Sequence, residues 1–165
     1  RLQPRPARSA AALGGAWGVA FQKDRGAPAM ATLTTLAPLN ENANPGIKYF
    51  SGIATYSKQF VPPKNWKVGQ PLWIDLGQVS EMAELFVNGK SAGAVWHAPY
   101  KLDIGALTKS GKNMLEVRVA NLWVNRLIGD AQPGAKPITW TPMATYGANA
   151  KLRPSGLIGP VRLEY

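Results

Sequence analysis

Residues 72–123 constrain the fold most, because they alternate between apolar and polar side chains around one sharply defined turn. The segment 82–87 (MAELFV) runs directly into Asn88-Gly89, and the chain returns through 90–96 (KSAGAVW). An Asn-Gly pair between two such runs is the strongest short hairpin signal, since a type I′ turn needs positive φ at both central residues. The pattern therefore predicts two antiparallel strands joined by a two-residue turn.

The same period of two marks other segments of the chain. In 115–119 (LEVRV) three aliphatic residues alternate with two charged ones, which is typical of a half-buried antiparallel strand. Further strands are expected at 17–21, near 33–39, and at 53–60, 72–76, 100–104, 114–121 and 159–165. Trp17 and Tyr56 alternate with core positions and are expected to be buried. Because no segment shows a convincing helical period, the sequence predicts an all-β fold, an antiparallel β-sandwich of about eight strands.

The length of 165 residues suits one domain. Residues 1–15 contain two prolines, a run of alanines and a Gly-Gly pair, which predicts a linker or disordered lead-in before a domain at 16–165. Residues 124–155 are rich in proline and predict a long surface excursion. Irregular loops of that length are uncommon and usually functional or disordered. The chain starts without an initiator Met or a signal-peptide pattern, so we expect a segment of a longer protein.

The net charge of +10 comes from 19 Lys and Arg against 9 Asp and Glu, spread along the chain without a long run of like charge. Nothing resembles a motif that reads DNA or RNA, so a solvated basic surface and no nucleic-acid partner are expected. Apolar runs are too short to span a membrane, and no membrane partner is expected. The chain has no cysteine, which excludes disulfides and fits a periplasmic or extracellular bacterial protein.

Three segments carry motifs of a known kind of domain. Residues 49–62 (YFSGIATYSKQFVP) contain F-S-G-x-A-x-Y-x-x-x-F, and residues 76–104 contain L-G-x-V, then V-N-G, a glycine, a tryptophan and a proline. Both patterns resemble the galactose-binding-like, family-2-type sugar-binding domains of large glycoside hydrolases, and this resemblance implies an antiparallel jelly-roll β-sandwich. The third segment, 113–130 (NMLEVRVANLWVNRLIGD) with 154–161 (PSGLIGPV), resembles the C-terminal domain of α-L-rhamnosidases of the glycoside hydrolase family 106 type.

The resemblance covers residues 47–165, and its most specific part is 121–130. In such enzymes the catalytic carboxylates lie on a separate barrel domain. The resemblance therefore implies a non-catalytic, carbohydrate-binding-like accessory domain of a bacterial glycoside hydrolase, most similar to an α-L-rhamnosidase. Its implied partners are carbohydrate and the catalytic domain of the parent enzyme. Two other functions stay open, a free-standing lectin and a purely structural interdomain module without a ligand.

Aromatic and polar side chains gather on two connections of the expected sandwich. Sugars stack an apolar face on exposed Trp or Tyr, while polar side chains fix their hydroxyls. The residues expected to bind carbohydrate on this ground are Trp96, His97, Tyr100, Trp123, Asn125, Arg126 and Asp130. The alternative is that Trp96 and Trp123 pack in the core or against another domain. Asn121, Arg126 and Asp130 would then form a structural lock on the long loop.

Catalysis by this chain is not expected. Hydrolysis of a glycosidic bond needs two carboxyl groups about 5–5.5 Å or 6.5–9.5 Å apart. The candidate pairs, Glu81 with Glu84 and Asp103 with Asp130, carry no further catalytic signal, and His97 is the single histidine. No catalytic residue, cofactor or metal ligand is therefore assigned. Calcium, which related jelly rolls often bind, stays open without a ligand set.

Overall fold

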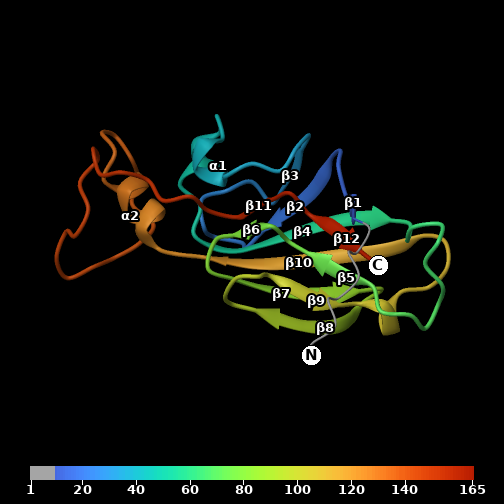
Figure 1. The fold of residues 1–165 in the computed structure, drawn as a ribbon. Coiled ribbons are helices and arrows are strands. Elements are labelled where there is room, and N and C mark those ends of the chain that lie inside the picture. Colours follow the sequence, from blue (N-terminus) through green and yellow to red (C-terminus); the bar gives the residue numbers. More distant parts are fainter. Residues whose placement is uncertain (1–9) are drawn as a thin grey trace, which may run out of the picture.

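Two antiparallel sheets form most of the fold in the computed structural model, which describes residues 10–165 (Figure 1). The larger sheet has six strands in the order β3 (Met30–Leu33), β2 (Trp17–Phe21), β4 (Gly52–Phe60), β10 (Asn113–Asn121), β7 (Met82–Val87) and β8 (Lys90–Val95). The smaller sheet has four strands in the order β1 (Ala10–Ala12), β12 (Arg162–Glu164), β5 (Trp73–Asp75) and β9 (Lys101–Asp103). A third pair joins β11 (Leu157–Gly159) to β6 (Gln78–Val79). The predicted all-β sandwich is confirmed.

Within the described residues, helical structure is confined to short pieces, which are α1 (Pro45–Lys48), α2 (Val124–Asp130) and the 3₁₀ turns η1 (Leu39–Glu41) and η2 (Gly105–Leu107). The start of the expected 124–155 excursion is thus a helix that the sequence analysis missed. Seven residues make only two turns, too few to show a helical period, although the ion pair between Arg126 and Asp130 has helical i,i+4 spacing. No helix within residues 10–165 is long and apolar enough to cross a membrane.

Two edges of the sandwich also differ from the expectation. Ala10–Ala12, inside the expected lead-in, form a strand whose Ala11 lies opposite Leu163 of β12. The free edge of β12 supplies the hydrogen-bond partners, and local composition does not reveal that edge. The strand expected near 33–39 is β3, three residues earlier. Short strands of this kind raise the number from about eight to twelve within the described part, and residues 1–9 of the lead-in lie outside it.

The core lies between the sheets and follows from the period of two. Along β10 the side chains of Leu115, Val117 and Val119 are fully buried, while the residues between them are not. Trp17 and Tyr56 are buried as predicted, with 1% and 0% exposure. Each large apolar side chain removed from water contributes about 1.5–3 kcal/mol. The alternating segments seen in the sequence therefore provide the main stabilisation of the sandwich.

The hairpin between β7 and β8 is the turn that the sequence predicts. Asn88 has φ 52° and Gly89 has φ 78°, so both central residues are left-handed. The side-chain nitrogen of Asn88, Nδ2, donates to the Leu107 carbonyl at 3.0 Å and to Asn113 Oδ1 at 2.8 Å. Its Oδ1 accepts from the Met114 amide at 3.1 Å. The turn is thereby tied to β10 as well as to its own strands.

Replacing Gly89 with valine is expected to lower the free energy of unfolding by about 1–3 kcal/mol, because a β-branched residue is strained at positive φ. A Cβ at this position would meet no atom within 4 Å, so the loss comes from the backbone alone. Urea denaturation measures it. The control is Gly147→Val, at a glycine that is also open but has no positive φ and should change little. An unchanged midpoint for Gly89→Val would contradict the type I′ assignment.

Candidate functional site

Strand register brings both predicted connections to one end of the six-stranded sheet. Val95, the last residue of β8, lies opposite Ala83, and Ala83 lies opposite Val119 near the end of β10. The connection after β8 and the connection after β10 therefore leave the sheet at the same end. In Figure 1 this is the end from which α2 projects. The candidate site is the group of side chains at this end.

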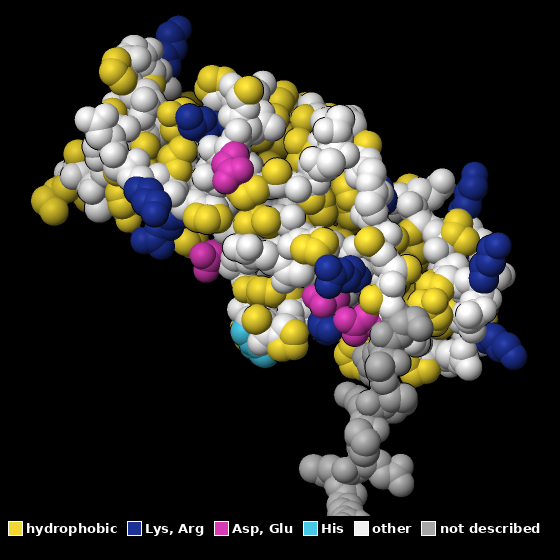
Figure 2. All heavy atoms as spheres, turned by 45° about the horizontal axis from the view of Figure 1, so that its top comes forward, with side chains coloured by type: hydrophobic (Ala, Val, Ile, Leu, Met, Phe, Trp, Pro, Cys, Tyr) yellow, Lys and Arg dark blue, Asp and Glu magenta, His cyan; other side chains and the backbone are white. Residues whose placement is uncertain are grey.

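The connection 96–100 presents an aromatic pair to solvent. Trp96 is 67% exposed, and its ring lies edge-on to the His97 ring with centroids 6.0 Å apart. His97 is exposed, with Nδ1 3.0 Å from the Ala98 carbonyl, and it is visible as the histidine on the face shown in Figure 2. Tyr100 is half-buried against the core, and its carbonyl accepts from the Leu76 amide at 2.9 Å. The indole face of Trp96 is thus open to a ligand, while Tyr100 anchors the connection.

The connection after β10 separates into an exposed and a buried part. Trp123 stands at the N-terminus of α2 and is 60% exposed. Asn125, two residues later, is only 3% exposed, and its amide pairs with the backbone of Arg153. Its Nδ2 donates to the Arg153 carbonyl at 2.7 Å, and its Oδ1 accepts from the Arg153 amide at 2.8 Å. Asn125 therefore fixes the far end of the excursion.

Arg126 and Asp130 form a second lock. Their side chains are 11% and 8% exposed, and Arg126 Nη2 lies 2.9 Å from Asp130 Oδ1. The other carboxylate oxygen accepts from the Ile138 amide at 3.2 Å, from the Thr139 amide at 2.9 Å and from the Thr139 hydroxyl. Burial by itself would raise the pKa of Asp130, but the hydrogen bonds from Thr139, the charge of Arg126 and the Ile138 amide together hold it below its usual value. The carboxylate therefore stays ionised and holds the excursion at Ile138 and Thr139.

Replacing Asp130 with asparagine is expected to destabilise the fold more at pH 7 than at pH 3. The folded-state pKa of Asp130 lies below its ordinary value of 3.8, so its contribution is present above that value and is lost as the pH falls through the folded-state pKa. Urea denaturation of both proteins at pH 7, 5 and 3 measures the difference in free energy of unfolding. A difference that stays constant over this range would contradict the role of the charged carboxylate.

Arg126 also borders a shallow pocket of about 400 Å³ between α1 and α2. Its guanidinium lies over the Tyr49 ring at 6.0 Å from the centroid. Gly129 makes this packing possible, since a Cβ there would lie 2.6 Å from both Tyr49 and Arg126 Nη2. The sequence analysis identified Arg126 but not Tyr49, because the segment that holds Tyr49 is distant in sequence.

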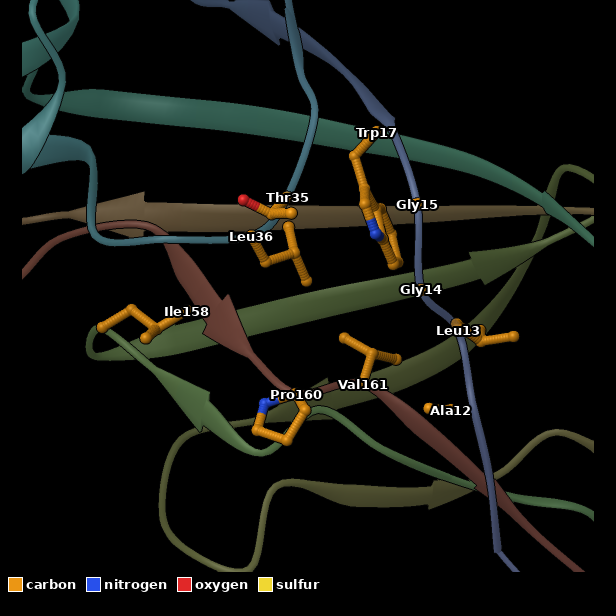
Figure 3. Close-up of a pocket in the computed structure, with 10 residues that line it drawn as sticks. All are labelled: Ala12, Leu13, Gly14, Gly15, Trp17, Thr35, Leu36, Ile158, Pro160 and Val161. Atoms are coloured by element: carbon orange, nitrogen blue, oxygen red, sulfur yellow. The ribbon is translucent and has the colours of Figure 1, made fainter.

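A second hollow, of about 290 Å³, lies away from the predicted residues (Figure 3). It is lined by Trp17, by residues 12–15 before it, by Thr35 and Leu36, by Ile158 of β11, and by Pro160 and Val161 between β11 and β12. Its walls are apolar apart from Thr35. The sequence analysis missed it because four of its ten lining residues come from the expected lead-in.

Two of the candidate carboxylates named from the sequence have structural partners in the described part of the chain. No three His, Asp or Glu side chains within residues 10–165 gather in a way that could hold a metal ion. Asp103, one of the candidate carboxylates, accepts from the amides of Leu72 at 3.0 Å and Gly105 at 2.9 Å. Asp130 is engaged with Arg126 and Thr139. These two carboxylates therefore have structural partners, and the exposed aromatic faces are the accessible part of the site.

Lys and Arg side chains are scattered over the face shown in Figure 2. One lysine is engaged between strands, since Lys101 Nζ lies 2.6 Å from Glu164 and 3.1 Å from Asp75. The hydrogen bond to Glu164 and then that to Asp75 raise the pKa of Lys101. This ion group joins β9, β5 and β12 and has a structural role.

Comparison with known proteins shows that the chain is similar to one part of much larger proteins. No family model matches it. Over 99% of its length it is similar to part of the rhamnosidase from Novosphingobium sp. PP1Y, with 58% identity and a TM-score of 0.94, and it covers 16% of that chain. It is 36% identical over 177 residues to a Formosa agariphila protein described as a beta-glucuronidase, covering 92% of itself and 15% of that relative.

More distant structures share the fold alone. The β-D-glucuronidase of Dictyoglomus thermophilum has a domain with 19% identity and a TM-score of 0.68, which covers 98% of this chain and 28% of that enzyme. The chain thus spans about one sixth of the rhamnosidase and of the Formosa protein. It corresponds to one small β-sandwich domain within much larger glycoside hydrolases.

Proposed function

We propose that this chain is a non-catalytic accessory domain of a bacterial α-L-rhamnosidase, with the galactose-binding-like jelly-roll form of the family 106 type. The observation that carries the proposal is the match to the Novosphingobium rhamnosidase, which has 58% identity over 99% of this chain and only 16% of that one. A whole sandwich that recurs as one sixth of an enzyme has the size of an accessory unit. The proposed compartment is periplasmic or extracellular, which the absence of cysteine permits.

The proposed ligand of the domain is carbohydrate, bound at the exposed end of the sandwich. Trp96 and Trp123 offer open indole faces of the kind that stack on sugars. His97 and Tyr100 lie on the same connection as Trp96, where they can contribute polar contacts. Asn125, Arg126 and Asp130, the remaining predicted residues, would act by holding the shape of this end, because their side chains are largely buried and paired.

A direct test of the non-catalytic role uses the chain with aryl α-L-rhamnosides as substrates. We expect no hydrolysis above background, because Asp103 and Asp130 are engaged by structural partners and the chain matches only 16% of the rhamnosidase. Turnover that disappears in the Glu81→Gln variant would overturn the accessory role. Glu81 is suited to this test because it is exposed and its replacement leaves the core intact.

A second test addresses sugar binding. Oligosaccharides that contain rhamnose or galacturonate, at millimolar concentration, should shift the amide NMR signals of residues 96–100 and 121–130. Trp96→Ala and Trp123→Ala should each abolish these shifts while the remaining spectrum stays folded. The matched control is Trp140→Ala, at an 82% exposed tryptophan outside the proposed sugar site, which should leave the shifts unchanged. Absence of any shift would overturn the sugar site and favour docking to another domain.

A further inference from the structure

Residues 131–152, which we call the arm, present large apolar side chains to solvent. Ile138 is 48% exposed, Trp140 82% and Met143 78%, all within a short stretch of the sequence. In Figure 1 the arm projects with α2 beyond the ends of the sheets. Exposed apolar groups concentrated in this way mark interaction surfaces, whereas a single exposed one needs no explanation.

The arm has no regular secondary structure, but hydrogen bonds fasten it at several points. Asp130 binds its backbone at Ile138 and Thr139. Gln132 Nε2 donates to the Ala148 carbonyl at 2.9 Å, which joins the first and last parts of the arm. Ordering a loop before it binds reduces the entropic cost of association. These bonds therefore prepare the arm to present Trp140 and Met143 to a partner.

Charge indicates the chemistry of that partner. The arm contains Lys136 and Lys151 and no Asp or Glu, and Arg153 follows directly after it. All three side chains belong to exposed residues. In Figure 2 the projecting part carries hydrophobic side chains beside Lys or Arg side chains. A complementary surface would have an apolar centre to receive Trp140 and Met143, surrounded by carboxylates.

We propose that the arm docks onto the catalytic domain of the parent enzyme, through an apolar hollow with an acidic rim. This inference rests on the proposed function, since it needs a parent chain. The Novosphingobium rhamnosidase is large enough to contain such a partner, because more than four fifths of its chain lies outside the matched region. Docking through the arm is distinct from sugar binding at Trp96 and Trp123, and the two surfaces can be tested separately.

The test uses the absence of cysteine in this chain, which makes an introduced thiol unique within it. Met143→Cys is made in the 165-residue chain and in the full-length product of its gene. The rate of maleimide labelling at that peptide is then followed by mass spectrometry. We expect labelling at least tenfold slower in the full-length protein. Trp140→Ser, added to the full-length Met143→Cys variant, should restore most of the rate, because Trp140 anchors the docked arm.

The matched control is Val68→Cys, at a 64% exposed residue in the loop between β4 and β5, at the other end of the sandwich. Its labelling rate should agree within about twofold between the two proteins. Equal rates for Met143→Cys in both proteins would overturn the proposal. Protection that rises with concentration of the short chain would overturn it in favour of a second copy. Protection of the short chain by a rhamnose oligosaccharide would overturn it in favour of a sugar site.

Failure of the proposed function appears in a different measurement. A full-length product that hydrolyses no α-L-rhamnoside contradicts the parent enzyme, whatever the labelling rates are. A different result is an active full-length product in which Met143→Cys is labelled as fast as in the 165-residue protein. That result would contradict docking through the arm but would leave the accessory role unchanged.

Discussion

Replacing Gly156 with alanine is expected to lower the free energy of unfolding by about 4 kcal/mol, a large loss for a single added methyl group. Gly156 has φ +87°, where an L-residue is strained. Its Cβ would also fall against the Tyr56 hydroxyl and 2.7 Å from Leu39 Cγ. Tyr56 and Leu39 are both buried, so neither has room to move away. The loss adds backbone strain to overpacking, and urea denaturation measures the sum.

The control for this prediction is Gly69→Ala. Gly69 has φ +91° but no atom within 4 Å of the position that an added methyl group would take, so only the backbone strain of about 1–2 kcal/mol should appear. A Tyr56→Phe background supplies a second check, because it removes the hydroxyl that the new methyl group would meet. The additional cost of Gly156→Ala should be smaller there than in the wild-type background. Equal losses at Gly69 and Gly156 would contradict the close packing around Gly156.

The sequence predicts the strands of the sandwich where the pattern is local. It predicts the β7–β8 hairpin at the observed turn, because residues 82–96 contain both an apolar alternation and the Asn-Gly pair. It does not predict β1 or α2. β1 depends on the free edge of β12, which lies near the other end of the chain, and α2 is too short to show a period. Elements that rest on distant partners leave no local signal.

The candidate site shows the same division. Trp96 and Trp123 can be named as candidates from the sequence, because they lie at or just after the ends of predicted strands, but only the structure shows that they are 67% and 60% exposed. The role of Asn125 cannot be separated from ligand binding in this way, since the same amide serves a sugar hydroxyl or a backbone group. Its burial and its two bonds to Arg153 depend on how the excursion returns to the sheet. Local patterns therefore locate the end of the sandwich that carries the site. Only the tertiary structure shows which of its residues are exposed to a ligand and which hold the excursion in place.

Asn121 is expected to be the other position of large effect, with Asn121→Leu lowering the free energy of unfolding by about 3 kcal/mol. Asn121 is 8% exposed, and its Nδ2 donates to the Gly52 carbonyl at 3.0 Å and the Val119 carbonyl at 3.2 Å. Its Oδ1 accepts from the Gly156 amide at 2.7 Å. Leucine has a similar volume but leaves these buried backbone groups without their partner, and each unsatisfied group costs about 1–3 kcal/mol.

Two further variants separate the hydrogen bonds from the volume change at this site. Asn121→Asp keeps an oxygen for the Gly156 amide but removes both donors, so it should also destabilise the fold. Asn149→Leu, at an exposed asparagine of the arm, should change the free energy of unfolding by about 0.5 kcal/mol or less. The lower stability of Asn121→Leu should be accompanied by faster amide hydrogen exchange at Gly156 and in residues 153–155, where the chain leads from the arm back to the sandwich. This follows because Asn121, the last residue of β10, bonds both to Gly52 of β4 and to Gly156. A loss of about 3 kcal/mol without faster exchange there would contradict the role of Asn121 in holding Gly156 against the sandwich.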